Sequence, residues 1–361
     1  METTTKNEHY NYKMVVLARE SRGLAQKDIA ELSGISQGKI SKLENGLIPI
    51  ADEEIQVLSS VMDYPLSFFK RTDRIYGVGI SEYFHRKRQS VSQKSLNKIY
   101  AKLEIRRIEI AALLKSVDIG DVTVPAIDPE EYDNDIETIA QVVRANWRVP
   151  KGPIDNVVEL IEEAGAVLVP FDFEKANVDG ISLWHPGMPP LIFVNFDRPM
   201  DRIRFTICHE LGHLVLHRNM PSNGADIEEQ ADRFASEFLM PAMEIAPLLR
   251  GVSIQKLASL KPYWKTSMSS MLKKSIDLGY VNERNARYFW MQMNKLGYRT
   301  TEPPELSPPI EKPQLLDDIV SVYQNDFKYS VSDICKVLSL NYNEVKHLYF
   351  KSDNNHLRLI K

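Results

Sequence analysis

The sequence predicts a multi-domain protein that is mainly α-helical and has one small α+β domain in its centre. With 361 residues, the chain is long enough for two or three domains with their own cores. Apolar residues recur at helical spacing near the N-terminus and again after residue 200. Between these regions, three short β-rich segments are bounded by Gly, Pro and Asn, which is typical of strands.

The composition is that of an ordinary globular protein, with 43% hydrophobic and 26% charged residues. No apolar run approaches the ~20 residues that a membrane-spanning helix needs. The first residues, METTTKNEHYNYK, contain no apolar stretch like that of a secretory signal. The two cysteines, Cys208 and Cys335, lie far apart and suggest no disulfide framework. We therefore expect a protein of the reducing cytoplasm with no membrane association.

The charge is unevenly distributed, although the net charge is only −4. Residues 1–117 carry 19 Lys and Arg against 14 Asp and Glu, whereas the remainder carries 26 against 35. A basic first third beside an acidic remainder favours an anionic partner for the first third alone.

Residues 13–46 predict two short amphipathic helices around a tight turn at Gly34. Ser36 is a suitable N-cap for the second helix, and Asn45 followed by Gly46 ends it. This is the helix-turn-helix pattern, whose second helix enters the major groove of DNA. The face that it would present to DNA carries Gln37, Gly38, Lys39, Ser41 and Lys42. Gln pairs well with adenine, and Lys reaches guanine or phosphate.

This segment resembles the Cro/C1-type (XRE-family) helix-turn-helix domain over residues 12–70, through the stretches LAQ (24–26), IA (29–30), GIS (34–36) and LENG (43–46). The resemblance implies closing helices at residues 51–63 and 65–69 and an internal ion pair between Arg19 and Glu44. It also implies phosphate contacts from Gln26 and Asn45, and base contacts from Gln37 and Lys42. Gly38 departs from the pattern, since a side chain often reads a base there. A helical module that binds protein is the alternative.

The central region combines helices with the three strand-like segments. We expect a long helix at residues 93–115, helices over IETIAQVVRANW (136–147) and from Pro153 to Gly165, and strands within residues 166–173, 180–186 and 191–196. A further helix contains the stretch TICHELGHLVLH (206–217).

Two histidines in that stretch, His209 and His213, are four residues apart and therefore share one helix face. Imidazoles at this spacing can hold one Zn²⁺, and Glu210 can act as general base towards water at the metal. His217 lies too far along the axis from His209, by roughly 12 Å, to bind the same metal, so we interpret it as structural.

The third ligand is expected on the amphipathic helix of residues 227–241. Glu228 would complete a site of two His and one Glu with a fourth position open, and Asp232 would accept the spare N–H of a ligand histidine. Glu229 is the rival ligand. Acids on a helix are more often simply a solvated face, but the His-Glu-x-x-His motif nearby favours the metal.

The combined stretches RIRFTICHELGHLVLH, LIFVN and EEQADRFASEFLMP resemble the ImmA/IrrE family of metallopeptidases over about residues 140–245. The resemblance implies a gluzincin-like α+β domain with His209, His213 and Glu228 as zinc ligands and Glu210 as catalytic base. In such enzymes an edge strand pairs with the substrate, and GISLW or LIFVN is the candidate. Tyr263 and Arg204 are conjectures for the group that stabilises the oxyanion.

The last third is expected to be helical. Residues 251–302 resemble the helical extension of the same family, and a proline-rich linker follows at residues 303–313. Residues 331–350 have a helix-turn-helix rhythm, for which we favour domain packing over partner binding. No close internal repeat is evident.

These features predict five segments, namely a DNA-binding domain at 12–75, a helical connector at 76–125, a zinc metallopeptidase domain at 126–250, its extension at 251–302 and a small helical unit at 314–361. We expect a transcriptional regulator that binds double-stranded operator DNA, possesses a zinc endopeptidase and cleaves a helix-turn-helix repressor. A homodimer is plausible. The alternatives are a regulator whose metal site is only structural or sensory, and a helical interaction module.

Overall fold

The computed structural model describes residues 10–76, 92–174, 176, 178–218 and 226–350. The chain forms two compact units. The first contains the described residues up to Ile119 and those from Leu316 onwards, and the second contains residues 120–315. The mainly helical, multi-domain fold class is confirmed, and none of the described helices is long and apolar enough to cross a bilayer.

The first unit begins with a five-helix bundle, which matches the expected helix-turn-helix domain. Its helices are α1 (Tyr12–Ser21), α2 (Gln26–Ser33), α3 (Gln37–Glu44), α4 (Asp52–Met62) and α5 (Leu66–Phe69). Between α2 and α3, Gly34 adopts φ 73°, a left-handed conformation that glycine reaches without steric cost. One apolar side chain from each of these two helices, Ile29 and Ile40, is almost fully buried. The tight turn therefore fixes α3 on the bundle and leaves its other face free.

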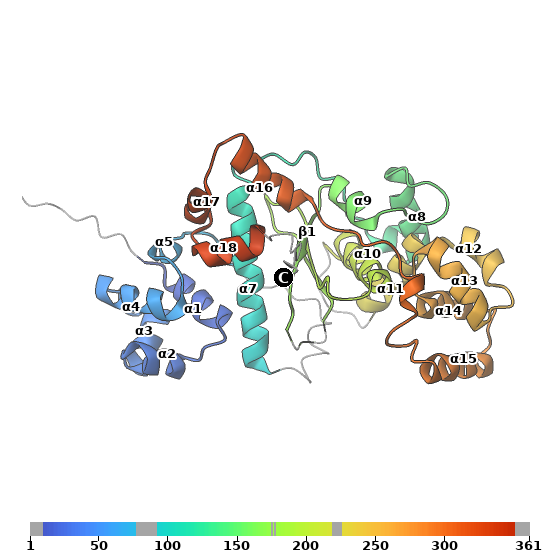
Figure 1. The fold of residues 1–361 in the computed structure, drawn as a ribbon, viewed down its shortest axis with the longest axis horizontal. Coiled ribbons are helices and arrows are strands. Elements are labelled where there is room, and N and C mark those ends of the chain that lie inside the picture. Colours follow the sequence, from blue (N-terminus) through green and yellow to red (C-terminus); the bar gives the residue numbers. More distant parts are fainter. Residues whose placement is uncertain (1–9, 77–91, 175, 177, 219–225, 351–361) are drawn as a thin grey trace, which may run out of the picture. The chain divides into compact units, whose positions relative to one another are not determined.

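The long helix of the connector, α7 (Gln93–Leu113), packs against α1 (Figure 1). Ser92 caps its first turn, so the predicted start at residue 93 is confirmed. Residues 77–91 of the predicted connector lie outside the described residues. Four charged side chains of α7 are buried, and they neutralise each other in two pairs, Arg107 with Glu104 and Arg106 with Glu109.

Three C-terminal helices complete this unit, namely α16 (Leu315–Asn325), α17 (Val331–Leu338) and α18 (Tyr342–Tyr349). The Tyr349 hydroxyl contacts Arg106 and donates to Glu109 at 2.8 Å, and the Tyr323 hydroxyl donates to the carbonyl of Leu113 at 2.8 Å. These buried contacts join the C-terminal helices to α7, which supports the packing role expected for this segment.

The pair α17–α18 repeats the geometry of α2–α3, in agreement with the helix-turn-helix rhythm noted for residues 331–350. In each pair, two eight-residue helices flank a three-residue turn that starts with a left-handed residue, Gly34 or Ser339. An Asp in the first turn, Asp28 or Asp333, accepts the backbone N–H of the residue before the helix. Few of the matched residues are identical, so the repeat lies in the backbone geometry and the apolar spacing.

The second unit surrounds a small sheet with helices. Before the sheet lie the 3₁₀ turn η2 (Pro129–Tyr132), α8 (Ile136–Asn146) and α9 (Val157–Glu163); after it come α10 (Met200–Leu216), α11 (Ile227–Leu239), α12 (Ala242–Leu249), α13 (Ile254–Trp264), α14 (Met268–Asp277), α15 (Glu283–Lys295) and η3 (Pro304–Leu306). The predicted start of α9 at Pro153 is wrong. The Asn156 side chain accepts from the N–H of Glu159 at 3.1 Å, and this cap starts the helix at Val157.

The strands β1 (Val167–Pro170), β2 (Gly180–Leu183) and β3 (Leu191–Val194) form a sheet of order β1-β3-β2. The central strand β3 is parallel to β1 and antiparallel to β2, with Ile181 opposite Phe193. Because β3 is paired on both sides, the LIFVN segment cannot be the free edge. Of the two expected candidates, only GISLW forms an edge strand.

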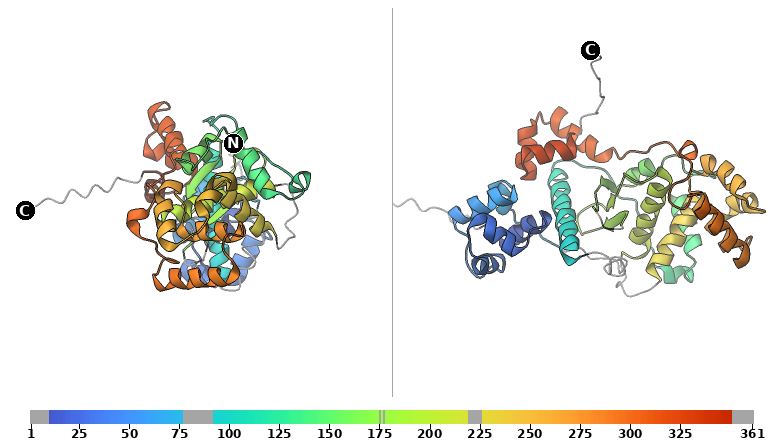
Figure 2. Two further views of the ribbon diagram at one scale, coloured as in Figure 1. Left: turned by 90° about the vertical axis from the view of Figure 1, so that its right-hand side faces the viewer. Right: turned by 60° about the horizontal axis from the view of Figure 1, so that its bottom comes forward.

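Helix α10 packs against β2 and β3 on one side and against α11 on the other, so it lies between the sheet and α11 (Figures 1 and 2). Gly212 allows α10 and α11 to approach closely, since a Cβ there would lie 3.2 Å from the Cα of Ala231. The close approach brings the polar faces of α10 and α11 together.

The proline-rich segment of residues 303–313 is not a free linker, contrary to the expectation. Glu311 is 5% exposed, accepts the N–H groups of Val157 and Val158 at 2.8 and 3.2 Å, and forms an ion pair with Arg204 of α10. The segment therefore ties the start of α9 to α10.

Candidate metal centre and nucleic-acid interface

The crossing of α10 and α11 brings three of the expected metal ligands together. His209 and His213 lie one turn apart on α10, and Glu228 lies in the first turn of α11. One ligand atom from each of the three residues lies within 4.8 Å of the others. The two imidazole Nε2 atoms are 3.1 Å apart, and the Glu228 oxygens lie 3.4 Å from Nε2 of His209 and 3.5 Å from Nε2 of His213.

These distances fit a single tetrahedral ion. Ligand atoms at 2.0–2.1 Å from a tetrahedral zinc lie about 3.4 Å from one another. The two Nε2 atoms are 3.1 Å apart, and each lies 3.4 or 3.5 Å from a different oxygen of the Glu228 carboxylate, so the two imidazoles and this carboxylate could hold one ion between them. Two nitrogens and one oxygen are donors that Zn²⁺ accepts readily, and a fourth position would remain open.

The Glu228 carboxylate also indicates a cation site. Both of its oxygens are buried, and neither has a hydrogen-bond partner among the described residues. A buried carboxylate without partners is costly, and a cation would satisfy it. The negative charge around His209 also favours a bound cation. Burial lowers the pKa of His209, but its contacts with Asp232 and Glu228 outweigh burial and raise the pKa to about 10.

Asp232 lies where a partner of a ligand histidine is expected. Its Oδ1 is 2.8 Å from Nδ1 of His209, and its side chain is 60% exposed. With Nδ1–H donated to this carboxylate, His209 directs its Nε2 atom towards Glu228. The rival ligand Glu229 is exposed and lies outside the cluster that the described residues form.

His217 makes a contact that the sequence reasoning missed. Its Nδ1 lies 3.0 Å from Nδ1 of His213, and its Nε2 lies 2.9 Å from Oε1 of Gln230 on α11. The helical rise excludes His217 as a ligand together with His209, but it does not exclude contact with the nearer ligand His213. Nothing in the sequence singles out Gln230 as a site residue, because a lone glutamine on a helix is usually solvated.

Glu210 lies on the sheet side of α10 and is 7% exposed. Its Oε2 accepts a hydrogen bond of 2.7 Å from the Ser182 hydroxyl on the edge strand β2. Burial raises the pKa of Glu210, and the charge of His209 and the Ser182 contact oppose that rise. Gly180 makes the approach possible, because a Cβ there would meet Thr206 at 2.6 Å and Glu210 at 3.1 Å. The pattern of the sequence pointed to Glu210 but not to Ser182.

The structure supports neither of the two residues conjectured to stabilise the oxyanion. Arg204 is 0% exposed, and its guanidinium is held by Glu311 and by the carbonyl of Ile154 at 2.7 Å. It cannot reach a substrate, so that expectation is wrong. Tyr263 is exposed on α13, where its hydroxyl lies beside Gly152. No contact among the described residues connects it to the histidine cluster.

In the first unit, α3 exposes the side chains expected to meet DNA. Gln37, Lys39, Lys42 and Asn45 are exposed, and Ser41 is half-buried. Lys39 forms an ion pair with Glu54, and the Asn45 amide donates to the carbonyl of Ser41 at 2.7 Å. Gln37 and Lys42 are therefore the more available side chains.

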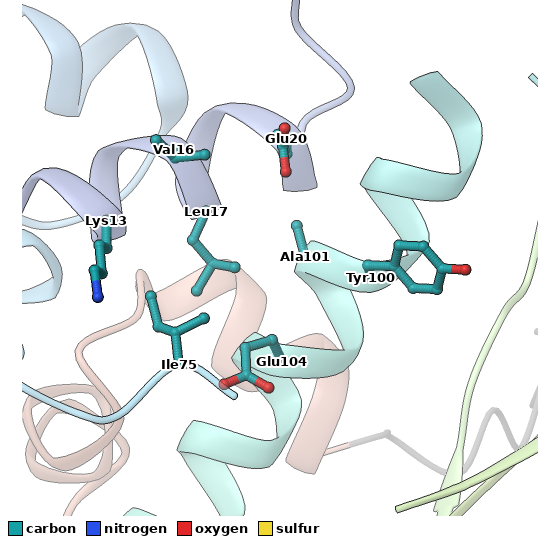
Figure 3. A pocket seen from close by; sticks show the side chains of 8 residues that line it. All are labelled: Lys13, Val16, Leu17, Glu20, Ile75, Tyr100, Ala101 and Glu104. Atoms are coloured by element: carbon teal, nitrogen blue, oxygen red, sulfur yellow. The ribbon is translucent and has the colours of Figure 1, made fainter. Parts of the chain in front are cut away.

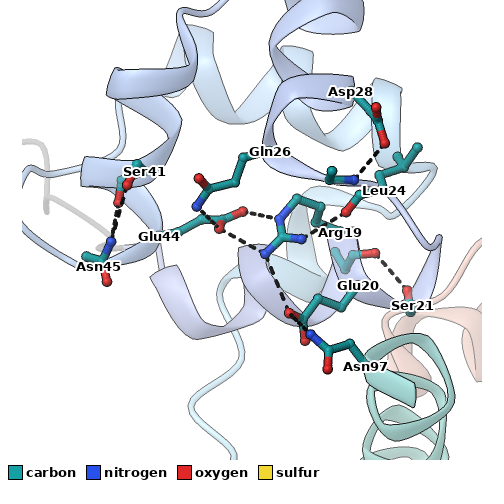
Figure 4. Close-up of polar contacts among 12 residues, drawn as sticks. Arg19, Glu20, Ser21, Leu24, Gln26, Asp28, Ser41, Glu44, Asn45 and Asn97 are labelled. Carbon is teal, nitrogen blue, oxygen red and sulfur yellow. Dashed lines mark hydrogen bonds and ion pairs between the residues drawn. The ribbon is translucent and has the colours of Figure 1, made fainter. Parts of the chain in front are cut away.

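A polar network holds α3 to the bundle (Figure 4). Arg19 pairs with Glu44 through two contacts of 2.5 and 3.0 Å, and Gln26 donates to the same carboxylate at 2.8 Å. The expected Arg19–Glu44 pair is confirmed. The Gln26 amide donates one N–H to Glu44, so its second N–H and the backbone N–H groups at the start of α2 remain for the expected phosphate contact.

A cavity of about 260 Å³ lies between α1 and α7 (Figure 3). Its lining is mainly apolar, and its two carboxylates already have partners, since Asn97 donates to Glu20 and Arg107 pairs with Glu104. It contains no histidine or cysteine, so the metal chemistry belongs to the α10–α11 crossing.

The fold therefore joins a helix-turn-helix module to an α+β domain whose two crossing helices, α10 and α11, bring His209, His213 and Glu228 together. Comparison with family models agrees. Residues 17–69 match the family described as helix-turn-helix, and residues 161–275 match a peptidase family described as IrrE N-terminal-like domain. The two resemblances drawn from the sequence are thus confirmed, and they support a DNA-binding regulator with a protease-like domain. A search of curated proteins gives no match.

Proposed function

We propose that this protein is a DNA-binding transcriptional regulator with a zinc-dependent endopeptidase, and that the endopeptidase cleaves a repressor of the helix-turn-helix class. The convergence within 4.8 Å of His209, His213 and Glu228, whose carboxylate has no hydrogen-bond partner among the described residues, carries the proposal. Glu210 beside that cluster favours catalysis over a structural metal, because a structural site needs no general base.

These three side chains would hold zinc, as their mutual distances and the absence of a hydrogen-bond partner for the Glu228 carboxylate indicate. Bound there, zinc would supply Lewis acidity, which polarises a peptide carbonyl and makes water nucleophilic near neutral pH. Asp232 orients His209 through Nδ1. The cluster is half-buried, which strengthens every charge interaction within it.

Glu210 would move the proton. Ser182 donates to Oε2 of this carboxylate and holds it in place, and the carboxylate would take a proton from the attacking water. The same carboxyl group would then give that proton to the leaving amine nitrogen of the cleaved bond. Burial raises the pKa of Glu210, which favours a group that both accepts and releases a proton.

The substrate would lie along β2. This strand is an edge of the sheet, and an extended peptide can add to such an edge through backbone hydrogen bonds. Ser182 on the same strand holds Glu210. A peptide seated on β2 would therefore have its backbone next to the general base.

The first unit would recognise double-stranded operator DNA through α3. Gln37 and Lys42 would face base edges, and Lys39, Ser41, Asn45 and Gln26 would lie near the backbone phosphates. Readers of this kind commonly bind paired half-sites, so we propose a homodimer on DNA.

The test compares the full chain with its Glu210→Gln variant on co-encoded helix-turn-helix repressors. We expect the variant to keep zinc and operator binding and to lose cleavage by at least a hundredfold, since general acid–base catalysis contributes about 10²–10⁴. Glu229→Gln is the matched control, because Glu229 is exposed on α11. If the wild type cleaves no repressor and Glu210→Gln leaves regulation unchanged, the metal site is structural or sensory and the peptidase proposal fails.

A further inference from the structure

A chain of hydrogen bonds leads from α11 to the second candidate ligand. It starts at Oε1 of Gln230, passes at 2.9 Å to Nε2 of His217, and continues at 3.0 Å from Nδ1 of His217 to Nδ1 of His213. The far nitrogen of His213, Nε2, points into the cluster with His209 and Glu228. These hydrogen bonds therefore connect α11 to the imidazole whose Nε2 faces the proposed metal.

The chemistry of each group fixes the direction of these bonds. An amide oxygen only accepts, so Nε2 of His217 carries the hydrogen. A neutral imidazole has one N–H, which leaves Nδ1 of His217 as an acceptor. His213 must then donate through Nδ1, and its Nε2 is left with a lone pair.

We propose that His217 and Gln230 are positioning residues that hold His213 in the tautomer whose Nε2 lone pair faces the metal. The inference rests on the proposed metal site and deepens it. Asp232 performs the corresponding task for His209 with a charged acceptor at 2.8 Å, whereas His213 receives a neutral acceptor. Apart from Glu228, only His209 therefore has a negatively charged partner, and His213 has a neutral one.

The two helices make this arrangement possible. His217 is the C-cap residue of α10, four residues after His213, and its backbone N–H donates to the His213 carbonyl at 3.0 Å. Gln230 lies two residues after Glu228 on α11, so the helix that supplies the acidic ligand also supplies the start of the chain. A displacement of α10 or α11 would break these hydrogen bonds and would also separate the three candidate ligands.

Position 230 offers a sharp test, because donor and acceptor can be exchanged there. Gln230→Glu keeps only acceptors and preserves the tautomer. Gln230→Lys offers only donors, so it forces the hydrogen of His217 onto Nδ1 and that of His213 onto Nε2, where it blocks the metal. Glu229→Gln changes the charge by the same amount as Gln230→Lys at an exposed neighbouring position and serves as the control.

The first readout is zinc affinity of the full-length chain, measured by competition with a chromophoric chelator. We expect Gln230→Lys and His217→Phe to weaken zinc binding by roughly 10- to 100-fold, as for other partners of metal-bound histidines. Gln230→Glu and Glu229→Gln should stay within about threefold of the wild type on the same grounds. Wild-type affinity in Gln230→Lys, or equal losses in the Glu and Lys variants, would overturn the inference.

The second readout is the tautomer itself, from imidazole ¹⁵N shifts of the metal-free chain. We expect the hydrogen of His213 on Nδ1 in the wild type and on Nε2 in Gln230→Lys. A wild-type His213 with its hydrogen on Nε2 would refute the inference even if zinc binds. A wild-type chain that binds no zinc but shows the expected tautomers would instead refute the proposed metal site, so the two failures are told apart.

Discussion

Removing the Glu311 carboxylate should destabilise the second unit strongly. Glu311 is 5% exposed and pairs with Arg204, which is 0% exposed and also donates to the carbonyl of Ile154. Breaking a buried ion pair by removing one partner costs about 3–5 kcal/mol, because the other charge stays buried. Glu311 also accepts the first N–H groups of α9, a capping contribution of about 1 kcal/mol.

We therefore expect Glu311→Ala to lower the free energy of unfolding by about 4 kcal/mol. For a unit of this size, that corresponds to a Tm lower by roughly 8–16 °C. Circular dichroism during thermal and urea unfolding measures both quantities. Glu305→Gln, in the same proline-rich segment but exposed, should behave like the wild type. A loss below about 1 kcal/mol in Glu311→Ala would refute the view that this segment anchors α10.

Three further predictions concern the two surfaces. Asp232→Asn should weaken zinc binding by roughly 10- to 100-fold in chelator competition, and an unchanged affinity would contradict the role of Asp232 in orienting His209. Ser182→Ala should keep zinc but lower kcat/KM roughly tenfold, since it removes a hydrogen bond to a charged group worth about 1.5 kcal/mol or more; equal loss of zinc would point to misfolding instead. Gln37→Ala with Lys42→Ala should weaken binding to a selected operator by ~1–3 kcal/mol per lost base contact, and full affinity in a gel-shift titration would reject α3 as the recognition helix.

The spacing of residues along helices made much of the candidate site predictable. The interval of four between His209 and His213 placed two imidazoles on one face, and Glu228 and Asp232 had the same interval on the next helix. The structure brings Glu228 to the two histidines and Asp232 to His209. Local helical geometry was sufficient for the spacing within each helix, whereas the resemblance to the metallopeptidase family supplied the expectation that the two helices meet.

Contacts between elements could not be predicted in the same way. Ser182 is 28 residues from Glu210, and Glu311 is 107 residues from Arg204, so only the fold reveals these partners. The interpretation of His217 as structural was incomplete, since it considered the distance to His209 alone. The edge strand was likewise undecided between two segments until the sheet order was known.

Turn chemistry explains the remaining differences. Pro153 suggested a helix start, but Asn156 provides a side-chain cap that Pro cannot, and α9 begins after it. The helix-turn-helix rhythm of residues 331–350 was visible in the sequence, but it was not recognised as a repeat of α2–α3, because Ser339 replaces Gly34 at the left-handed position. A pattern that depends on backbone conformation and apolar spacing leaves little trace in residue identity.

The central claim is that His209, His213 and Glu228 hold one zinc ion with Glu210 left free as the base. X-ray absorption at the zinc edge of the loaded full-length chain tests this claim most directly. We predict one zinc per chain with two imidazole nitrogens and oxygen neighbours at about 2.0–2.2 Å, and loss of the ion in Glu228→Ala but not in Glu210→Gln. A sulfur neighbour, or zinc retained without Glu228 and lost without Glu210, would contradict the account.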